Sequence, residues 1–555
     1  MDLRNSLLEA ATVLADLHLY QASKWAAEAL NGMSPLTQEQ IFALSQTKHS
    51  SAKKSNQLDP VQLKDAERIL LASSYFNCKE FDRCGHVLKG CKSNKAVFLR
   101  LYAMYLSGEK RKQFDSDGVL GQKDGKTSNM ALSQVLKELS WCKDVSGRLD
   151  DPFLLYLAGI VTLKSSNDFR SAQELFYQSL TLYPFNWSCW RELIECLSSF
   201  QEAISMVSKF SRNSRFSENR SFHVMVVFFE VVVHQEFFQG STEVNNHLNF
   251  LLQLFPRLSF VKIQQALVCY NALDYQAAES IFDSVLTSDP LRLDDMDTYS
   301  NILYVMEKKS KLSFLAQHAL KIDPLRPETC CIVANYYSLK FDHQKAIMYY
   351  KRALSLDRNC LSAWTLMGHE FVELKNSHAA IESYRRAVDS NNKDFRAWYG
   401  LGQAYEVLDM NLYSLYYYQR ACELKPTDKR MWQAIGNCCE KLGEFEDAVK
   451  SYKKALNVSS ETDSSILYKL ATLYSEIGDS KNTKSYMIWC LNEEAEEGAT
   501  DESSKARLWL AKHELEAQNW QQAYKYATDL TYGTSHDIEE ARSIAREAGE
   551  RKSKE

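Results

Sequence analysis

Three tryptophans constrain the fold of this chain more than any other feature, because they recur at a fixed interval of 34 residues. Each tryptophan is followed by a glycine four residues later, a small residue sixteen residues later and a tyrosine twenty residues later. The three copies of this frame are Trp364, Gly368, Ala380 and Tyr384; Trp398, Gly402, Ser414 and Tyr418; and Trp432, Gly436, Ala448 and Tyr452. A recurrence of this kind indicates one structural unit repeated along the chain.

The period and the order of small and large residues are typical of tetratricopeptide repeats, in which each unit is a pair of antiparallel helices. Trp364 and Gly368 share one face of the first helix. A small residue at Gly368 allows the second helix to cross at close range, and Ala380 is the matching small residue. One helix pair cannot bury its apolar face alone, so the units stack. The sequence therefore predicts an all-α, superhelical tetratricopeptide-repeat solenoid with all frame residues in the core.

Weaker copies of the frame extend in both directions and indicate roughly 13 or 14 helix-turn-helix units. Residues 1–220 form a divergent N-terminal arm with two expected surface loops, a polar one at 45–59 and a charged, glycine-bearing one at 109–127. The frame slips out of register near 209–221, which favours a boundary there. A regular superhelix is expected over 221–500, and a last repeat with a charged capping helix over 501–555.

Composition excludes several classes of partner. The net charge is −5, so nucleic acid is not an evident partner. The 14 cysteines include no C-x-x-C pair, and the adjacent pairs Cys330–Cys331 and Cys438–Cys439 are predicted to be buried thiols. The most apolar run, Phe222 to Val233, is interrupted by Glu230 and is too short to span a bilayer. It predicts a buried helix and no membrane partner.

Catalysis is not expected from this sequence. It contains no phosphate-binding Walker loop, no dinucleotide glycine motif, no H-E-x-x-H and no zinc-finger spacing, so we expect no cofactor and no metal. The repeats also use nearly the whole chain. A glycosyltransferase with a repeat arm would need a nucleotide-sugar domain after the repeats, and too few residues remain for one. The chain is predicted to be a binding protein and not an enzyme.

The expected binding surface is the concave face, which the first helix of each unit lines. Polar residues recur there just after the small frame position, one helical turn beyond it, and one turn before it. These candidates are Asn335, His369, Gln403 and Asn437; Glu373, Glu406 and Glu440; and Tyr399. Amides can bind an extended peptide backbone, and the glutamates favour a basic peptide, especially one containing arginine. The alternative that these residues form a solvated helix face stays open.

A co-chaperone that clamps a C-terminal carboxylate is a weaker alternative. Such repeats place lysines and arginines early in the first helix. Here the corresponding positions are Cys331, Thr365, Tyr399 and Gln433, so no basic clamp forms. An adaptor for a different linear peptide remains the alternative reading.

Several segments closely resemble one known family. They are CCIVANYYSLK at 330–340, AWTLMGHEFVELKN at 363–376, RAWYGLGQAYEVLDM at 396–410 and MDTYSNILYV at 296–305. They resemble the tetratricopeptide subunits eight of the anaphase-promoting complex, the cell-division-cycle-twenty-three type. The resemblance covers most of the chain and is weakest near its two ends.

The resemblance implies a non-catalytic scaffold subunit of a multi-subunit, cullin-RING-type E3 ubiquitin ligase that drives exit from mitosis. The implied partners are other tetratricopeptide subunits, a second copy bound through the N-terminal repeats, and an activator protein. An arginine-bearing motif of the activator would enter the groove of the C-terminal superhelix. The implied localisation is the nucleus and cytoplasm.

Overall fold

A computed structural model describes residues 2–34, 60–115, 118–120, 127–142, 149–458 and 463–552. The described residues form 30 helices and contain no strand, which confirms the all-α repeat fold. The chain divides into two compact units, residues 1–358 and 359–555. The boundaries expected at 220 and 500 stay predictions, and the expected loop at 45–59 lies outside the described residues.

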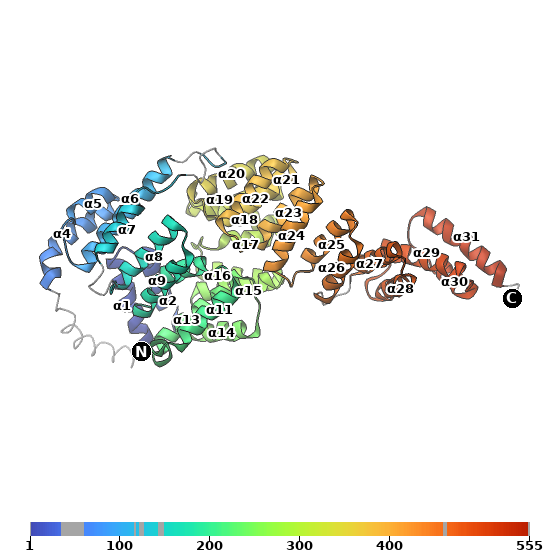
Figure 1. The fold of residues 1–555 in the computed structure, drawn as a ribbon, viewed down its shortest axis with the longest axis horizontal. Helices are drawn as coiled ribbons and strands as arrows, with labels where there is room; N and C mark the ends of the chain where they lie inside the picture. Colours follow the sequence, from blue (N-terminus) through green and yellow to red (C-terminus); the bar gives the residue numbers. More distant parts are fainter. Residues whose placement is uncertain are drawn as a thin grey trace. The chain divides into compact units, whose positions relative to one another are not determined.

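The first unit consists of helix pairs that follow one another along the chain (Figure 1). Its helices are α1 (Asp2–Asp16), α2 (Tyr20–Gly32), α4 (Pro60–Asn77), α5 (Phe81–Val87), α6 (Asn94–Asp115), α7 (Leu132–Trp141), α8 (Pro152–Ser166), α9 (Phe169–Leu182), α10 (Trp187–Cys196), α11 (Phe200–Arg212), α12 (Ser214–Glu218), α13 (Arg220–Glu236), α14 (Thr242–Leu254), α15 (Ser259–Asn271), α16 (Tyr275–Ser288), α17 (Met296–Val305), α18 (Lys309–Ile322), α19 (Pro327–Leu339) and α20 (His343–Leu356).

The second unit continues the same pairing and contains all three frame tryptophans. Its helices are α21 (Leu361–Glu373), α22 (Ser377–Ser390), α23 (Phe395–Val407), α24 (Asn411–Leu424), α25 (Lys429–Leu442), α26 (Phe445–Val458), α27 (Ser464–Ile477), α28 (Ser480–Glu497), α29 (Asp501–Glu516), α30 (Trp520–Thr528) and α31 (Ser535–Lys552). The final helix, α31, packs through Ala541 and Ile544 onto α29 and α30.

One continuous core joins the N-terminal helices to the middle of the first unit. The indole of Trp25 on α2 stacks on that of Trp187 on α10, with ring centroids 4.7 Å apart. Helices α11, α12 and α13, which contain or flank the register slip near 209–221, contribute Phe210, Phe216 and Val224 to this core. The apolar run beginning at Phe222 lies within α13 and is largely buried, as predicted.

The expected loop at 109–127 begins later than predicted, because α6 continues to Asp115. The side-chain amide of Asn129 donates to the Tyr105 carbonyl (3.2 Å) and to Glu109 (2.9 Å). Arg111 on the added turns pairs with Asp82 at 2.9 Å. These contacts come from residues distant in sequence, so composition alone could not show that 109–115 is helical.

In six successive repeats, the turn between the two helices contains one residue in the left-handed backbone conformation, and these residues recur every 34 positions. They are Leu273, Glu307, Phe341, Lys375 and Asp409, with φ between 54° and 66°, followed by Gly443 at 79°. Left-handed residues commonly end helices because they allow the last carbonyls to be satisfied. Only Gly443 among the six is the residue type that adopts this conformation without strain.

Candidate peptide-binding site

The glycines of the frame make room for the tyrosine rings of the second helices. A Cβ atom added to Gly368 would lie 2.5 Å from the ring of Tyr384, and one added to Gly402 would lie 2.5 Å from the ring of Tyr418. Gly436 has the same relation to Tyr452, at 2.8 Å. The second helix therefore approaches each glycine closely, as predicted, and it does so through the tyrosine ring. Ala380 and Ala448 are fully buried, as predicted.

The three frame tryptophans differ in burial, which corrects the expectation that all of them are core residues. Trp364 is buried, whereas Trp398 and Trp432 are half-buried. The indole Nε1 of Trp398 donates to the Asn392 carbonyl, and that of Trp432 donates to the Pro426 carbonyl, both at 2.9 Å. These two tryptophans therefore bind the loop before their helix as well as packing against the repeat.

The hydroxyl groups of the frame tyrosines form hydrogen bonds with several of the polar candidate residues that form a row on the first helices. The Tyr384 hydroxyl lies 2.8 Å from Nδ1 of His369. The Tyr452 hydroxyl donates to Oδ1 of Asn437 at 2.6 Å and lies 3.2 Å from Glu440. Each bond joins the two helices of one repeat, so the row has an internal structural role.

In the repeat between these two, the tyrosine hydroxyl binds a glutamate. Tyr418 donates to Oε2 of Glu406 at 2.7 Å, and Lys441 on the next first helix donates to Oε1 of the same carboxylate at 2.8 Å. Gln403 and Tyr399 lie nearby on α23, both half-buried, and the Tyr399 ring packs on that of Tyr418 at 5.3 Å. Glu406 therefore serves the repeat itself.

Asn335 belongs to the first unit and is only 2% exposed. Its amide donates to Oγ of Ser300 at 2.7 Å and to Oδ1 of Asn301 at 2.6 Å. The Tyr350 hydroxyl donates to its side-chain oxygen. These three bonds use both amide donors and the side-chain oxygen to tie α17, α19 and α20 together, which favours a structural role for Asn335 over peptide binding.

The remaining candidates lie together in the second unit but differ in their availability. Glu373 and Glu440 are exposed, while His369 and Asn437 are half-buried. Lys469 on α27 donates to Oδ1 of Asn437 at 2.6 Å, so that oxygen already has two donors. The exposed carboxylates are therefore the groups best placed to meet a ligand.

Burial determines the protonation of the hydrogen-bonded groups, namely His369 and the three tyrosine hydroxyls. It lowers the pKa of His369 to about 4, so the imidazole is neutral near pH 7 and its Nδ1 can accept from the Tyr384 hydroxyl. Burial also raises the pKa values of Tyr384, Tyr418 and Tyr452 well above their ordinary value. All three hydroxyls therefore remain protonated donors.

The role of the tyrosine hydroxyl was missing from the sequence-based account. The available signal was the choice of tyrosine over phenylalanine at one frame position in four successive repeats, 350, 384, 418 and 452. Phe176 fills the same place opposite Gly159, where an added Cβ would lie 2.5 Å from its ring. The ring alone satisfies the packing, so the hydroxyl has a separate purpose.

The described part of the chain has none of the features of a metal site or a membrane span. No group of three or more histidine, cysteine or acidic side chains there is arranged to hold a metal ion. None of the helices described combines the length and apolar character needed to cross a membrane. The adjacent cysteine pairs, Cys330–Cys331 and Cys438–Cys439, are buried thiols that form no disulfide, as predicted.

Comparison with known proteins places the chain in a family. Residues 2–266 match the family model described as anaphase promoting complex subunit 8 / Cdc23. Tetratricopeptide-repeat models match residues 327–360, 368–408 and 429–462. The solved crystal structure of the APC/C hetero-tetramer Cut9–Hcn1 shares the fold with a TM-score of 0.57 at 16% identity, over 86% of this chain and 88% of that one.

Two relatives match nearly end to end. The anaphase-promoting complex subunit CDC23 of Saccharomyces cerevisiae is 45% identical, over 98% of this chain and 97% of its own length. The anaphase-promoting complex subunit 8 of Arabidopsis thaliana is 41% identical, over 98% of this chain and 96% of its own length. The chain therefore belongs to the anaphase-promoting complex subunit 8 / Cdc23 family of tetratricopeptide-repeat proteins.

Proposed function

We propose that the chain is a non-catalytic scaffold subunit of the anaphase-promoting complex, which is a cullin-RING-type E3 ubiquitin ligase, and that it works in the nucleus and cytoplasm. In this role it organises neighbouring tetratricopeptide subunits and supports ubiquitination of cell-cycle proteins and mitotic exit. The end-to-end similarity to two subunits of that complex supports the proposal. A homodimer formed through residues 1–220 is part of the same proposal.

The second unit is proposed to bind an arginine-bearing motif of an activator on its first-helix face. The observation that carries this proposal is a pair of exposed carboxylates, Glu373 at the end of α21 and Glu440 near the end of α25. Neither forms an ion pair with lysine or arginine within the described part of the chain. A guanidinium group supplies planar, paired donors that suit carboxylates.

The half-buried residues of the intervening helix would shape the site. Gln403 and Tyr399 lie on α23, which stands between α21 and α25 in the order of the repeats. His369, Glu406 and Asn437 would act mainly by holding the tyrosines and, through them, the spacing of the helices. The peptide is thus expected to meet Glu373 and Glu440 first.

The test removes charge without changing shape. Glu373→Gln combined with Glu440→Gln in the full chain should weaken binding of an activator-derived, arginine-containing peptide about tenfold, measured by fluorescence anisotropy. The matched control is Glu423→Gln combined with Glu446→Gln, two exposed glutamates on the second helices α24 and α26. Equal affinity of both double variants and the unaltered chain would remove this face from the proposal.

A further inference from the structure

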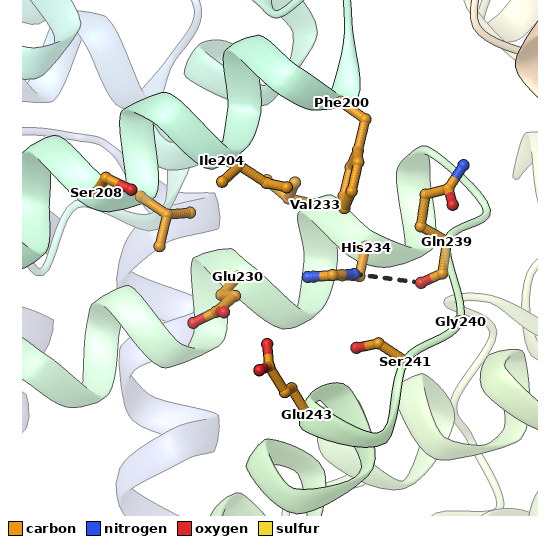
Figure 2. A pocket seen from close by; sticks show the side chains of 11 residues that line it. Phe200, Ile204, Ser208, Glu230, Val233, His234, Gln239, Gly240, Ser241 and Glu243 are labelled. Atoms are coloured by element: carbon orange, nitrogen blue, oxygen red, sulfur yellow. Dashed lines mark hydrogen bonds between the residues drawn. The ribbon is translucent and has the colours of Figure 1, made fainter.

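A pocket of about 390 Å³ opens in the first unit, far along the sequence from the candidate site (Figure 2). It is bounded by α11, by α13 and by the turn that leads into α14. Its size is in the range of pockets that hold a small ligand or one anchoring side chain. Nothing in the proposed activator binding uses this pocket.

One wall of the pocket is apolar. It is formed by Phe200, Ile204 and Val207 from α11 and by Val233 from α13. Ile204 is 46% exposed, so this wall continues onto the surface. A ligand with an aliphatic stem or an apolar neighbour could therefore be covered as it enters.

Several polar groups that line the pocket can accept hydrogen bonds. The carboxylates of Glu230 and Glu243 and the hydroxyl of Ser241 belong to its lining (Figure 2). His234 lies between them, with Nδ1 at 3.2 Å from the Gln239 carbonyl. A carbonyl only accepts, so the proton of the neutral ring is on Nδ1, and Nε2 is left as a further acceptor. None of the described residues that line the pocket is a lysine or an arginine.

Glu230 is the residue least explained by the fold alone. It interrupts the most apolar run of the sequence, and its side chain is 21% exposed. Within the described residues its ion-pair neighbour is His247, at 3.5 Å. A largely buried carboxylate is costly unless a cation and hydrogen bonds compensate it. The pocket opens onto this carboxylate and leaves room for such a cation.

We propose that this pocket binds an arginine side chain from an extended segment of another protein, with an apolar residue beside it on the apolar wall. A guanidinium group offers five donors, which suit two carboxylates, an imidazole nitrogen and a hydroxyl. Its flat face can also stack on the Phe200 ring. The site is a second anchoring point for a basic segment, located in the first unit and independent of Glu373 and Glu440.

The probe is a fluorescein-labelled peptide with one arginine between two leucines in a serine–glycine context. Its binding to the full chain is measured by anisotropy in the Glu373→Gln, Glu440→Gln background, which reduces any contribution from the second unit. We expect saturable binding that weakens at least tenfold when citrulline, the uncharged isostere, replaces arginine. Glu230→Gln should weaken binding by a similar factor, and Glu218→Gln, an exposed glutamate outside the pocket, should not.

A stability measurement separates ligand binding from a purely structural role. Without peptide, Glu230→Gln should leave the melting temperature unchanged or raise it, because it removes a poorly compensated charge. A clear fall would assign Glu230 to its contact with His247 and would overturn the proposal. Absence of saturable binding, equal affinity for the citrulline peptide, or unchanged binding by Glu230→Gln would also overturn it. If Glu230→Gln abolished self-association of the chain in analytical ultracentrifugation, the pocket would be occupied by a second copy of this chain. That result would also overturn the proposal.

Discussion

At the scale of single residues, the polar row of the first helices is explained by bonds inside each repeat. Asn335, His369 and Asn437 occupy equivalent positions, and each bonds the hydroxyl of the tyrosine on the paired helix. Helical phase places these residues on the correct helix and near the face. It cannot show that a buried hydroxyl fifteen residues later needs an acceptor there, because that depends on how two helices cross.

The histidine in this row makes one repeat sensitive to pH. The pKa of His369 is about 4 in the folded chain and about 6.5 when unfolded, so the unfolded state binds the proton more readily. Stability of α21 and α22 is therefore full above pH 6.5 and falls as pH drops toward 4. Because the ring is half-buried, we expect a loss of about 2 kcal/mol.

His369→Asn should remove this pH dependence and keep the tyrosine bond, because asparagine fills that role in two other repeats. Hydrogen exchange of the α21 and α22 amides between pH 6.5 and 4 measures the effect. His378→Asn on α22, an exposed histidine of the same repeat, is the matched control and should retain the wild-type slope. An unchanged slope in His369→Asn would contradict the assignment.

At the scale of elements, the turn inside each repeat has one backbone geometry with different residue types. Periodicity could not reveal it, since Leu273, Phe341, Lys375 and Gly443 share no chemical property. The helices themselves were predictable, because their apolar positions recur with the helical period. The extension of α6 through 109–115 was not predictable, because it depends on contacts with Asn129 and Asp82.

The turn geometry predicts opposite effects for two substitutions. Lys375→Gly should stabilise its repeat by about 0.5 kcal/mol, because glycine relieves the left-handed strain but adds freedom to the unfolded chain. Gly443→Ala should destabilise its repeat by about 1 kcal/mol. A Cβ at Gly443 would meet no atom within 4 Å, so this cost is one of backbone conformation alone.

Hydrogen exchange measures the free energy of local opening of a helix pair. Its change in α21–α22 gives the effect of Lys375→Gly, and its change in α25–α26 gives the effect of Gly443→Ala. Local measurement is needed because repeats of a solenoid need not unfold together. Effects of the same sign at Lys375 and Gly443 would show that the turn conformation does not limit stability.

At the scale of the whole molecule, the repeat architecture and the family were accessible from sequence, since the frame and the quoted segments are specific. The division of the chain into two units at residue 358 and the pocket beside Glu230 could not be predicted from the sequence. The sequence did mark Glu230 as a charge in an apolar run. It could not show that α11 and the turn before α14 leave a pocket next to that charge.

The central claim is that this subunit receives an activator on the first-helix face of its second unit within the assembled complex. Cross-linking mass spectrometry of an anaphase-promoting complex reconstituted with this chain and an activator tests it most directly. Lys441 and Lys469 contact the candidate row through Glu406 and Asn437, so they report on that face. We expect cross-links from both lysines to residues flanking the activator's arginine motif. Cross-links from that motif only to residues 1–358, or only to other subunits, would contradict it.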